Sequence, residues 1–207
     1  PYFFGRNRND QTYCMLQAGW PHPGKLPKGS DTKQKILFRL GTQAFANADF
    51  SKAIEYFNRS LAIGQYNMSA KADAYYWRGE ANYRLEHYAQ AGNDLRRYLE
   101  FAPDKMNREY GLALYNLGYT DFKQKNYNGA LNWFTRFVDR GTVNDRAVQA
   151  DAYNRIGDCF LNERNFDEAK HYYAQAESMN ASSGDYSFYQ LALVSGLQKD
   201  YSGKITL

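Results

Sequence analysis

The chain has 207 residues, of which 43% are hydrophobic and 23% charged, and this mixture is typical of a globular protein rather than a disordered one. The formal net charge of +4 comes from residues 1–40, which hold seven basic and two acidic residues, whereas the remainder holds 19 basic and 20 acidic residues. A basic face for nucleic acid is therefore not predicted. No apolar run approaches the roughly 20 residues of a membrane-spanning helix, and two cysteines do not make a disulfide framework.

Residues 1–30 are predicted to form a segment of their own. Tyr13, Leu16 and Trp20 fall on one face of a helix, which would be the second helix of a preceding half-repeat, and a β-hairpin is the competing interpretation. Residues 21–30 contain three of the five prolines and are predicted to be a loop. Ser30 or Asp31 is expected to cap the helix that follows.

Four segments of the chain then repeat one pattern. Each has a glycine, an aromatic residue nine positions later and an alanine twelve positions later, and the glycines are 38, 39 and 39 residues apart. The glycines are Gly41, Gly79, Gly118 and Gly157, the aromatic residues are Phe50, Tyr88, Tyr127 and Phe166, and the alanines are Ala53, Ala91, Ala130 and Ala169. Three columns kept in register four times indicate a tandem repeat.

Each repeat is predicted to be an antiparallel pair of helices. Apolar residues recur at helical spacing around the glycine, a polar dipeptide such as Glu86-His87 ends the first helix, and the aromatic residue begins the second. A glycine inside a helix costs about 1 kcal/mol relative to alanine, so its recurrence indicates close packing against the second helix, with the alanine as the other half of the contact. One pair cannot bury both apolar faces, so neighbouring pairs must stack.

The predicted fold class is therefore all-α, with a solenoid of antiparallel helix pairs over residues 31–207. Four full repeats are placed at about 31–66, 67–103, 104–141 and 142–180, followed by a truncated fifth at 181–207. The first helix of the fifth repeat is expected to start at about Tyr186, with Tyr201 in its turn. The residues between the units are expected to lengthen the first helices by about one turn.

The pattern resembles the tetratricopeptide repeat, in which Leu-Gly, paired aromatic residues, Ala and a final Pro recur, as in Leu117-Gly118 and Pro103. The period of 38–39 residues is longer than the usual 34, and Arg78 replaces the Leu before Gly79. The resemblance implies a right-handed α-α superhelix that acts as a scaffold for protein–protein interaction. The segment ADAYYWRGEANYRLEHY is similar to the long repeats of bacterial proteins of cell-envelope assembly and coordination. This resemblance implies a periplasmic or outer-membrane-associated location.

No residues have the spacing of a catalytic, metal or cofactor site. His22, His87 and His171 occupy unrelated positions, in a loop, a turn and a second helix, and are interpreted as solvated. The glycines serve the repeat rather than a phosphate-binding loop, and no Cys/His cluster has zinc-site spacing. We therefore expect no enzyme activity, no metal and no cofactor.

A binding surface is predicted on the first helices, which line the concave face of a curved repeat array. Residues beside the buried stripe are expected to point into this groove as an aromatic ladder flanked by charges, because peptide grooves use rings with polar tips as anchors. The alternative is that the rings only fill space between neighbouring helices. The predicted groove residues are Phe38, Thr42, Tyr76, Glu80, Arg84, Tyr115, Tyr119, Asn154, Asp158 and Tyr189.

The leading functional prediction is a non-catalytic scaffold that binds a protein or peptide segment in this groove, with no nucleic acid and no membrane span. Two alternatives come from other classes of protein. Exposed tyrosine faces can stack on sugars, which would make the chain a carbohydrate- or peptidoglycan-binding module. A passive structural spacer whose ends self-associate is the second alternative.

Overall fold

The computed structural model describes residues 29–64, 67–179 and 184–198. Within these ranges the chain forms nine helices and no strand. The predicted N-terminal helix or hairpin and Tyr201 lie outside them. The helices are α2 (Ser30–Ala46), α3 (Phe50–Ala62), α4 (Met68–Arg84), α5 (Tyr88–Phe101), α6 (Arg108–Lys123), α7 (Tyr127–Arg140), α8 (Arg146–Asn162), α9 (Phe166–Ser178) and α10 (Gly184–Leu197).

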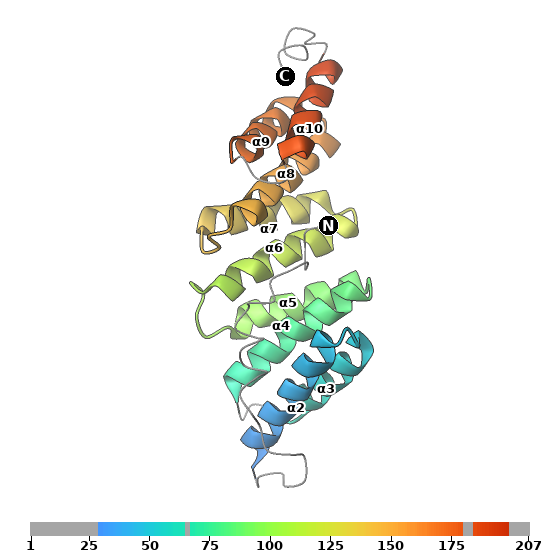
Figure 1. The fold of residues 1–207 in the computed structure, drawn as a ribbon, viewed down its shortest axis with the longest axis vertical. Helices are drawn as coiled ribbons and strands as arrows, with labels where there is room; N and C mark the ends of the chain where they lie inside the picture. The colour runs from blue at the N-terminus through green and yellow to red at the C-terminus, as the bar shows by residue number, and fades with distance from the viewer. Residues whose placement is uncertain (1–28, 65–66, 180–183, 199–207) are drawn as a thin grey trace.

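Successive helices pack as antiparallel pairs that stack along one long axis (Figure 1). In the four full repeats, each first helix packs against the second helix of its own repeat, and each second helix packs against the first helix of the next repeat. The first helices α2, α4, α6 and α8 have 16 or 17 residues, whereas the second helices have 13 or 14. The predicted all-α helical-repeat superhelix is therefore confirmed, and its first helices are about one turn longer than its second helices.

The repeated glycine makes room for a large side chain of the second helix. A Cβ atom at Gly118 would lie only 2.6–2.8 Å from three atoms of the Phe134 ring. The same holds in two other repeats, for Gly41 with Phe57 and for Gly157 with Tyr173. Alanine was predicted to be the residue of the second helix that contacts the glycine. The nearest neighbour of each glycine is instead the side chain four positions after the alanine. The alanines are fully buried beside it.

The turn inside each pair contains one residue with a left-handed backbone. Ala48, Glu86, Lys125 and Arg164 have φ values between 59° and 62° and open the polar dipeptides predicted to end the first helices. The next residue is Asp49, Asn126 or Asn165 in three repeats, and its side chain accepts a hydrogen bond from the backbone N–H three residues later. Such a bond satisfies one of the free N–H groups at a helix start. His87 stands at this position in the second repeat, and its side chain makes no cap bond.

Replacing His87 with asparagine is expected to raise the free energy of unfolding by about 1 kcal/mol, because the amide oxygen can accept the Gln90 N–H as Asn126 accepts the N–H of Gly129. Urea unfolding followed by circular dichroism measures this change. Asn126→Ala is the matched control and should lower the stability by a similar amount. Equal midpoints for His87→Asn and the parent chain would contradict the expectation.

Arg78, which breaks the Leu-Gly pattern of the second repeat, forms an ion pair across that repeat. Its Nε and Nη2 atoms donate to the two carboxylate oxygens of Asp94 on α5, at 2.9 and 2.5 Å, and Asn82 donates to the same carboxylate at 3.1 Å. The Arg78 side chain is 22% exposed and that of Asp94 is 7% exposed. A paired, bidentate contact of this kind satisfies both charges. The residue that replaces the pattern's leucine thus joins α4 to α5 through charge.

The start of α2 corrects a further prediction. Gly29 occupies the N-cap position, and no side chain caps the helix, so neither Ser30 nor Asp31 is the cap. Asp31 lies inside the first turn, where its carboxylate accepts a hydrogen bond from Asn67 at 2.7 Å and pairs with Lys35 at 2.9 Å. The carboxylate thus joins the start of α2 to the start of α4.

Candidate functional site

The first helices of neighbouring repeats are joined by polar contacts, and we call the surface formed by α2, α4, α6, α8 and α10 the first-helix face. Asn116 of α6 donates a hydrogen bond to Glu80 of α4. Ser187 of α10 donates to Asn154 of α8 at 2.9 Å. All four side chains are buried. Buried hydrogen bonds are costly to leave unmade, so these contacts fix how successive repeats sit against each other.

The ten predicted groove residues all belong to first helices but differ in exposure. Arg84 is exposed, Tyr189 is 63% exposed and Phe38 is half-buried. The others are buried: Thr42, Tyr76, Glu80, Tyr115, Tyr119, Asn154 and Asp158. The rings of Tyr76, Tyr115 and Tyr119 therefore pack between helices, as the alternative interpretation expected, while their part in binding a partner stays a prediction.

Rings of the aromatic ladder pack on the second helix of their own repeat. The Tyr76 ring lies 5.1 Å from that of Tyr98 on α5, edge to face. The Tyr115 ring lies 5.2 Å from that of Phe137 on α7. Offset and edge-on ring pairs at such distances add to the stabilisation from burial. The ladder thus anchors the first helices on the second helices.

A polar cluster of the first-helix face is centred on Asp151 of α8. The hydroxyl groups of Tyr115 and Tyr119 on α6 both donate to its Oδ2, the first at 2.7 Å. Arg155 Nε lies 3.6 Å from Asp151 Oδ1, and Arg155 Nη1 lies 2.5 Å from Asp158 Oδ2. Burial, and then the charge of Asp151, raise the pKa of Tyr119, so its hydroxyl remains a donor at neutral pH.

Two carboxyl groups of α4 lack such donors. Asp73 is half-buried and accepts one long hydrogen bond, from Ser69 at 3.5 Å. Glu80 is 2% exposed, and its Oε2 atom has no hydrogen-bond partner in the described ranges. Burial raises the pKa of Asp73 to about 6, to which the charge of Glu109 on α6 contributes, and burial also raises the pKa of Glu80. Both groups are thus desolvated without full compensation.

Asp73→Asn is expected to stabilise the protein above pH 6. The folded chain holds a proton on Asp73 up to a pKa of about 6, whereas the unfolded chain releases it near 3.8. Because the folded state binds more protons between these values, stability falls as the pH rises through this window. The asparagine variant should lack this loss, which is on the order of 1–2 kcal/mol after allowance for partial exposure. Urea unfolding at pH 4.5 and 7.0 measures it, and an equal pH dependence in both proteins would contradict the shifted pKa.

Two acidic residues of the first-helix face, Asp73 and Asp151, were not identified from the sequence, although a signal was present. Asp73 and Asp151 lie 78 residues apart in two copies of the segment ADAY, at residues 72–75 and 150–153. An acid that recurs between two buried alanines does not follow from amphipathic packing alone. Arg155 was also missed, although its two acidic partners lie four residues before and three after it, which is the spacing of ion pairs on a helix.

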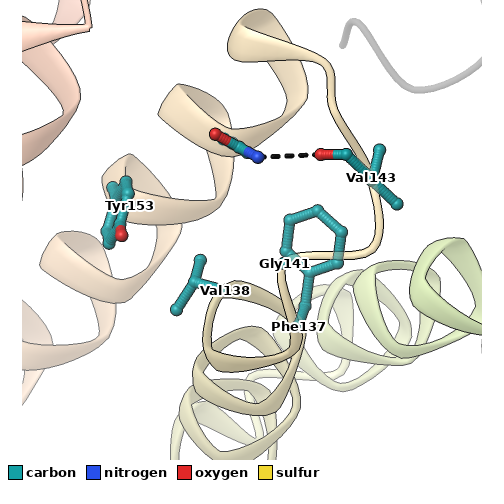
Figure 2. A pocket seen from close by; sticks show the side chains of 6 residues that line it. Phe137, Val138, Gly141, Val143 and Tyr153 are labelled. Atoms are coloured by element: carbon teal, nitrogen blue, oxygen red, sulfur yellow. Dashed lines mark hydrogen bonds between the residues drawn. The ribbon is translucent and has the colours of Figure 1, made fainter. Parts of the chain in front are cut away.

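A small pocket lies between the end of α7 and the start of α8, and its lining includes none of the predicted groove residues (Figure 2). Its volume is about 60 Å³. Gln149 closes one side by donating to the Val143 carbonyl at 2.8 Å. A space of this size holds a few water molecules at most. The pocket is lined by Phe137, Val138, Gly141, Val143, Gln149 and Tyr153.

Residues 29–64, 67–179 and 184–198 contain neither a metal-binding cluster nor a membrane-spanning helix. No group of three His, Cys, Asp or Glu side chains in these ranges is placed to hold a metal ion. None of the helices there combines the length and the apolar character needed to cross a membrane. Burial raises the pKa of the Cys159 thiol to about 12, so this cysteine stays protonated at neutral pH and is a poor nucleophile.

Similarity to known proteins covers most of the chain. Residues 38–105 and 150–183 match the tetratricopeptide repeat. Among solved structures, the chain is similar to YrrB, a TPR protein with an unusual peptide-binding site, at 20% identity and a TM-score of 0.67 over 82% of this chain and 80% of that one. It is also similar to MamA (18% identity, TM-score 0.71, 84% and 87% of the chains) and to a MamA fragment from Desulfovibrio magneticus RS-1 (15%, 0.70, 88% and 92%). No curated protein matches the chain.

Proposed function

We propose that the chain, two segments of which match the tetratricopeptide repeat, is a non-catalytic scaffold that binds an extended segment of a partner protein along the first-helix face. The observation that carries this proposal is the continuity of that face, whose helices are joined from α4 to α10 by buried and part-buried hydrogen bonds. Stacked helix pairs present such a layer as an extended concave surface. The peptide-binding site of YrrB, a protein of similar fold, agrees with this use.

The ten predicted groove residues have two roles in this proposal. The buried members, such as Tyr76 and Tyr115, hold the helices in register and shape the surface. Phe38, Arg84 and Tyr189 have exposed side-chain surface and contact the partner. Aromatic and arginine side chains are enriched among residues that dominate binding energy, which supports this assignment.

Selection of random 12-residue peptides on the full chain, followed by titration of an enriched peptide, tests the proposal. Arg84→Glu on α4 should weaken binding by roughly tenfold. Arg97→Glu on α5 is the matched control, because it makes the same charge change on a second helix, at a side chain that is 59% exposed. Equal effects of the two substitutions, or no enriched peptide, would overturn the assignment of binding to the first-helix face.

A further inference from the structure

The second and fourth repeats carry the same pair of acidic residues on the first-helix face. These residues occupy equivalent positions 78 residues apart: Asp73 and Glu80 in α4, and Asp151 and Asp158 in α8. The position between the two acids holds Trp77 in α4 and Arg155 in α8. The fourth repeat thus contains its own cation, and the second repeat has an indole ring in its place.

The donors that satisfy Asp151 are all replaced around Asp73. In place of Tyr115, the preceding first helix has Phe38, which carries no polar group. In place of Tyr119 it has Thr42, whose hydroxyl donates to the Arg39 carbonyl of its own helix at 2.9 Å.

The position of Arg155 is also occupied by a side chain that cannot neutralise Asp73. The Trp77 ring packs edge-on against Phe45 of α2, with their centroids 5.1 Å apart. Within the described ranges, Asp73 accepts a hydrogen bond from Ser69 and Glu80 accepts one from Asn116. The charge of Arg84 also acts on Glu80, whereas no such cation among the described residues acts on Asp73.

The surroundings of this acidic pair favour a cation. Asp73 keeps part of its surface exposed, so that a ligand group can reach it. Glu80 lies two turns further along α4 with one buried, unpartnered carboxyl oxygen. Glu109 of α6 is close enough for its charge to act on Asp73. A partly desolvated carboxylate gains most from a charge-assisted hydrogen bond to an ammonium or guanidinium group.

We infer that the first-helix face at Asp73 and Glu80 receives a lysine or arginine side chain of the bound partner, which supplies to Asp73 the positive charge that Arg155 supplies to Asp151 in the fourth repeat. The inference rests on the proposed function and adds the chemistry of the partner. The partner segment carries a basic residue opposite α4, whereas an acidic side chain or a terminal carboxylate would be repelled there.

Peptide selection on the full chain tests this inference with random 12-residue peptides as the probe. Peptides enriched on the parent chain should share one Lys or Arg position, and those enriched on Asp73→Asn should not. Replacing that basic residue with alanine in an enriched peptide should weaken binding to the parent chain by roughly tenfold or more. The same change should have little effect on binding to Asp73→Asn, because the two groups form one contact.

Two further variants make the test independent of folding and net charge. Glu80→Gln keeps an acceptor for Asn116 but removes the second carboxyl group, and it should weaken binding of the basic peptide in the same direction. Asp139→Asn makes the same charge change on the second helix α7, at an exposed side chain, and should leave binding unchanged.

Enriched peptides that bind the parent chain and Asp73→Asn equally well would overturn the inference and leave the scaffold function standing. A parent chain that enriches no peptide would overturn both.

Discussion

Gly118→Ala is expected to destabilise the protein by about 2 kcal/mol, although alanine is the better helix former. The new Cβ atom would lie 2.6–2.8 Å from three atoms of the Phe134 ring, which is itself fully buried. A ring in a close-packed interior cannot move aside without displacing its neighbours, and overpacking typically costs 1–3 kcal/mol or more. The gain of about 1 kcal/mol from helix propensity offsets only part of this cost. Urea unfolding of the two proteins measures the difference.

Gly79→Ala is the matched control, because its neighbour is a leucine rather than a ring. A Cβ atom there would lie 3.1 Å from Leu95 Cγ and 3.3 Å from the Ala91 carbonyl oxygen, so small shifts accommodate it. We expect a change in stability within about 0.5 kcal/mol. Phe134→Leu should likewise make Gly118→Ala less costly, since it gives the third repeat the pairing of the second. Equal losses for Gly79→Ala and Gly118→Ala would contradict the packing argument.

Asp151→Ala is expected to lower the free energy of unfolding by about 3 kcal/mol. It removes the shared acceptor of the Tyr115 and Tyr119 hydroxyl groups, both of which are on buried residues. A buried donor left without its partner costs about 1–3 kcal/mol. The substitution also leaves Arg155, whose side chain is 17% exposed, with a single carboxylate.

Asp73→Ala provides the comparison at the equivalent position of the second repeat. Asp73 has one long hydrogen bond to lose, and removal of a partly desolvated charge offsets that loss. The stability of the Asp73→Ala variant at pH 7 should equal or exceed that of the parent chain. Thermal unfolding at pH 7 measures both variants. Similar losses for Asp73→Ala and Asp151→Ala would show that the two acids are equally well satisfied, against the contacts described above.

The repeat architecture could be predicted from the sequence because it depends on local, periodic signals. The glycine column and the polar dipeptide of each turn lie within one helix pair, and their spacing alone indicates the pairing. The residue that contacts each glycine was predicted wrongly, because sequence spacing does not show which side chain of the facing helix lies nearest to it. Asp31 was also offered as the cap of α2. Its carboxylate instead accepts a hydrogen bond from Asn67, which is distant in sequence.

The candidate site was less predictable than the fold. The ten groove residues follow from helical phase, but their exposure depends on how closely the next repeat approaches, as the burial of Tyr76 and Tyr115 shows. The weakly satisfied Asp73 stands out only when its donors are compared with those of Asp151 in three dimensions. A location in the bacterial cell envelope stays a prediction.

The hydrogen bonds between successive first helices also set a fixed spacing along the array. The bonds from Asn116 to Glu80, from Tyr115 to Asp151 and from Ser187 to Asn154 each fix the offset of one helix against the next. The exposed side chains of the first-helix face therefore lie at fixed intervals along the array. In the proposed complex, two side chains of the partner segment contact the face at a fixed separation. Inserting one residue between them would leave only one of the two contacts in place.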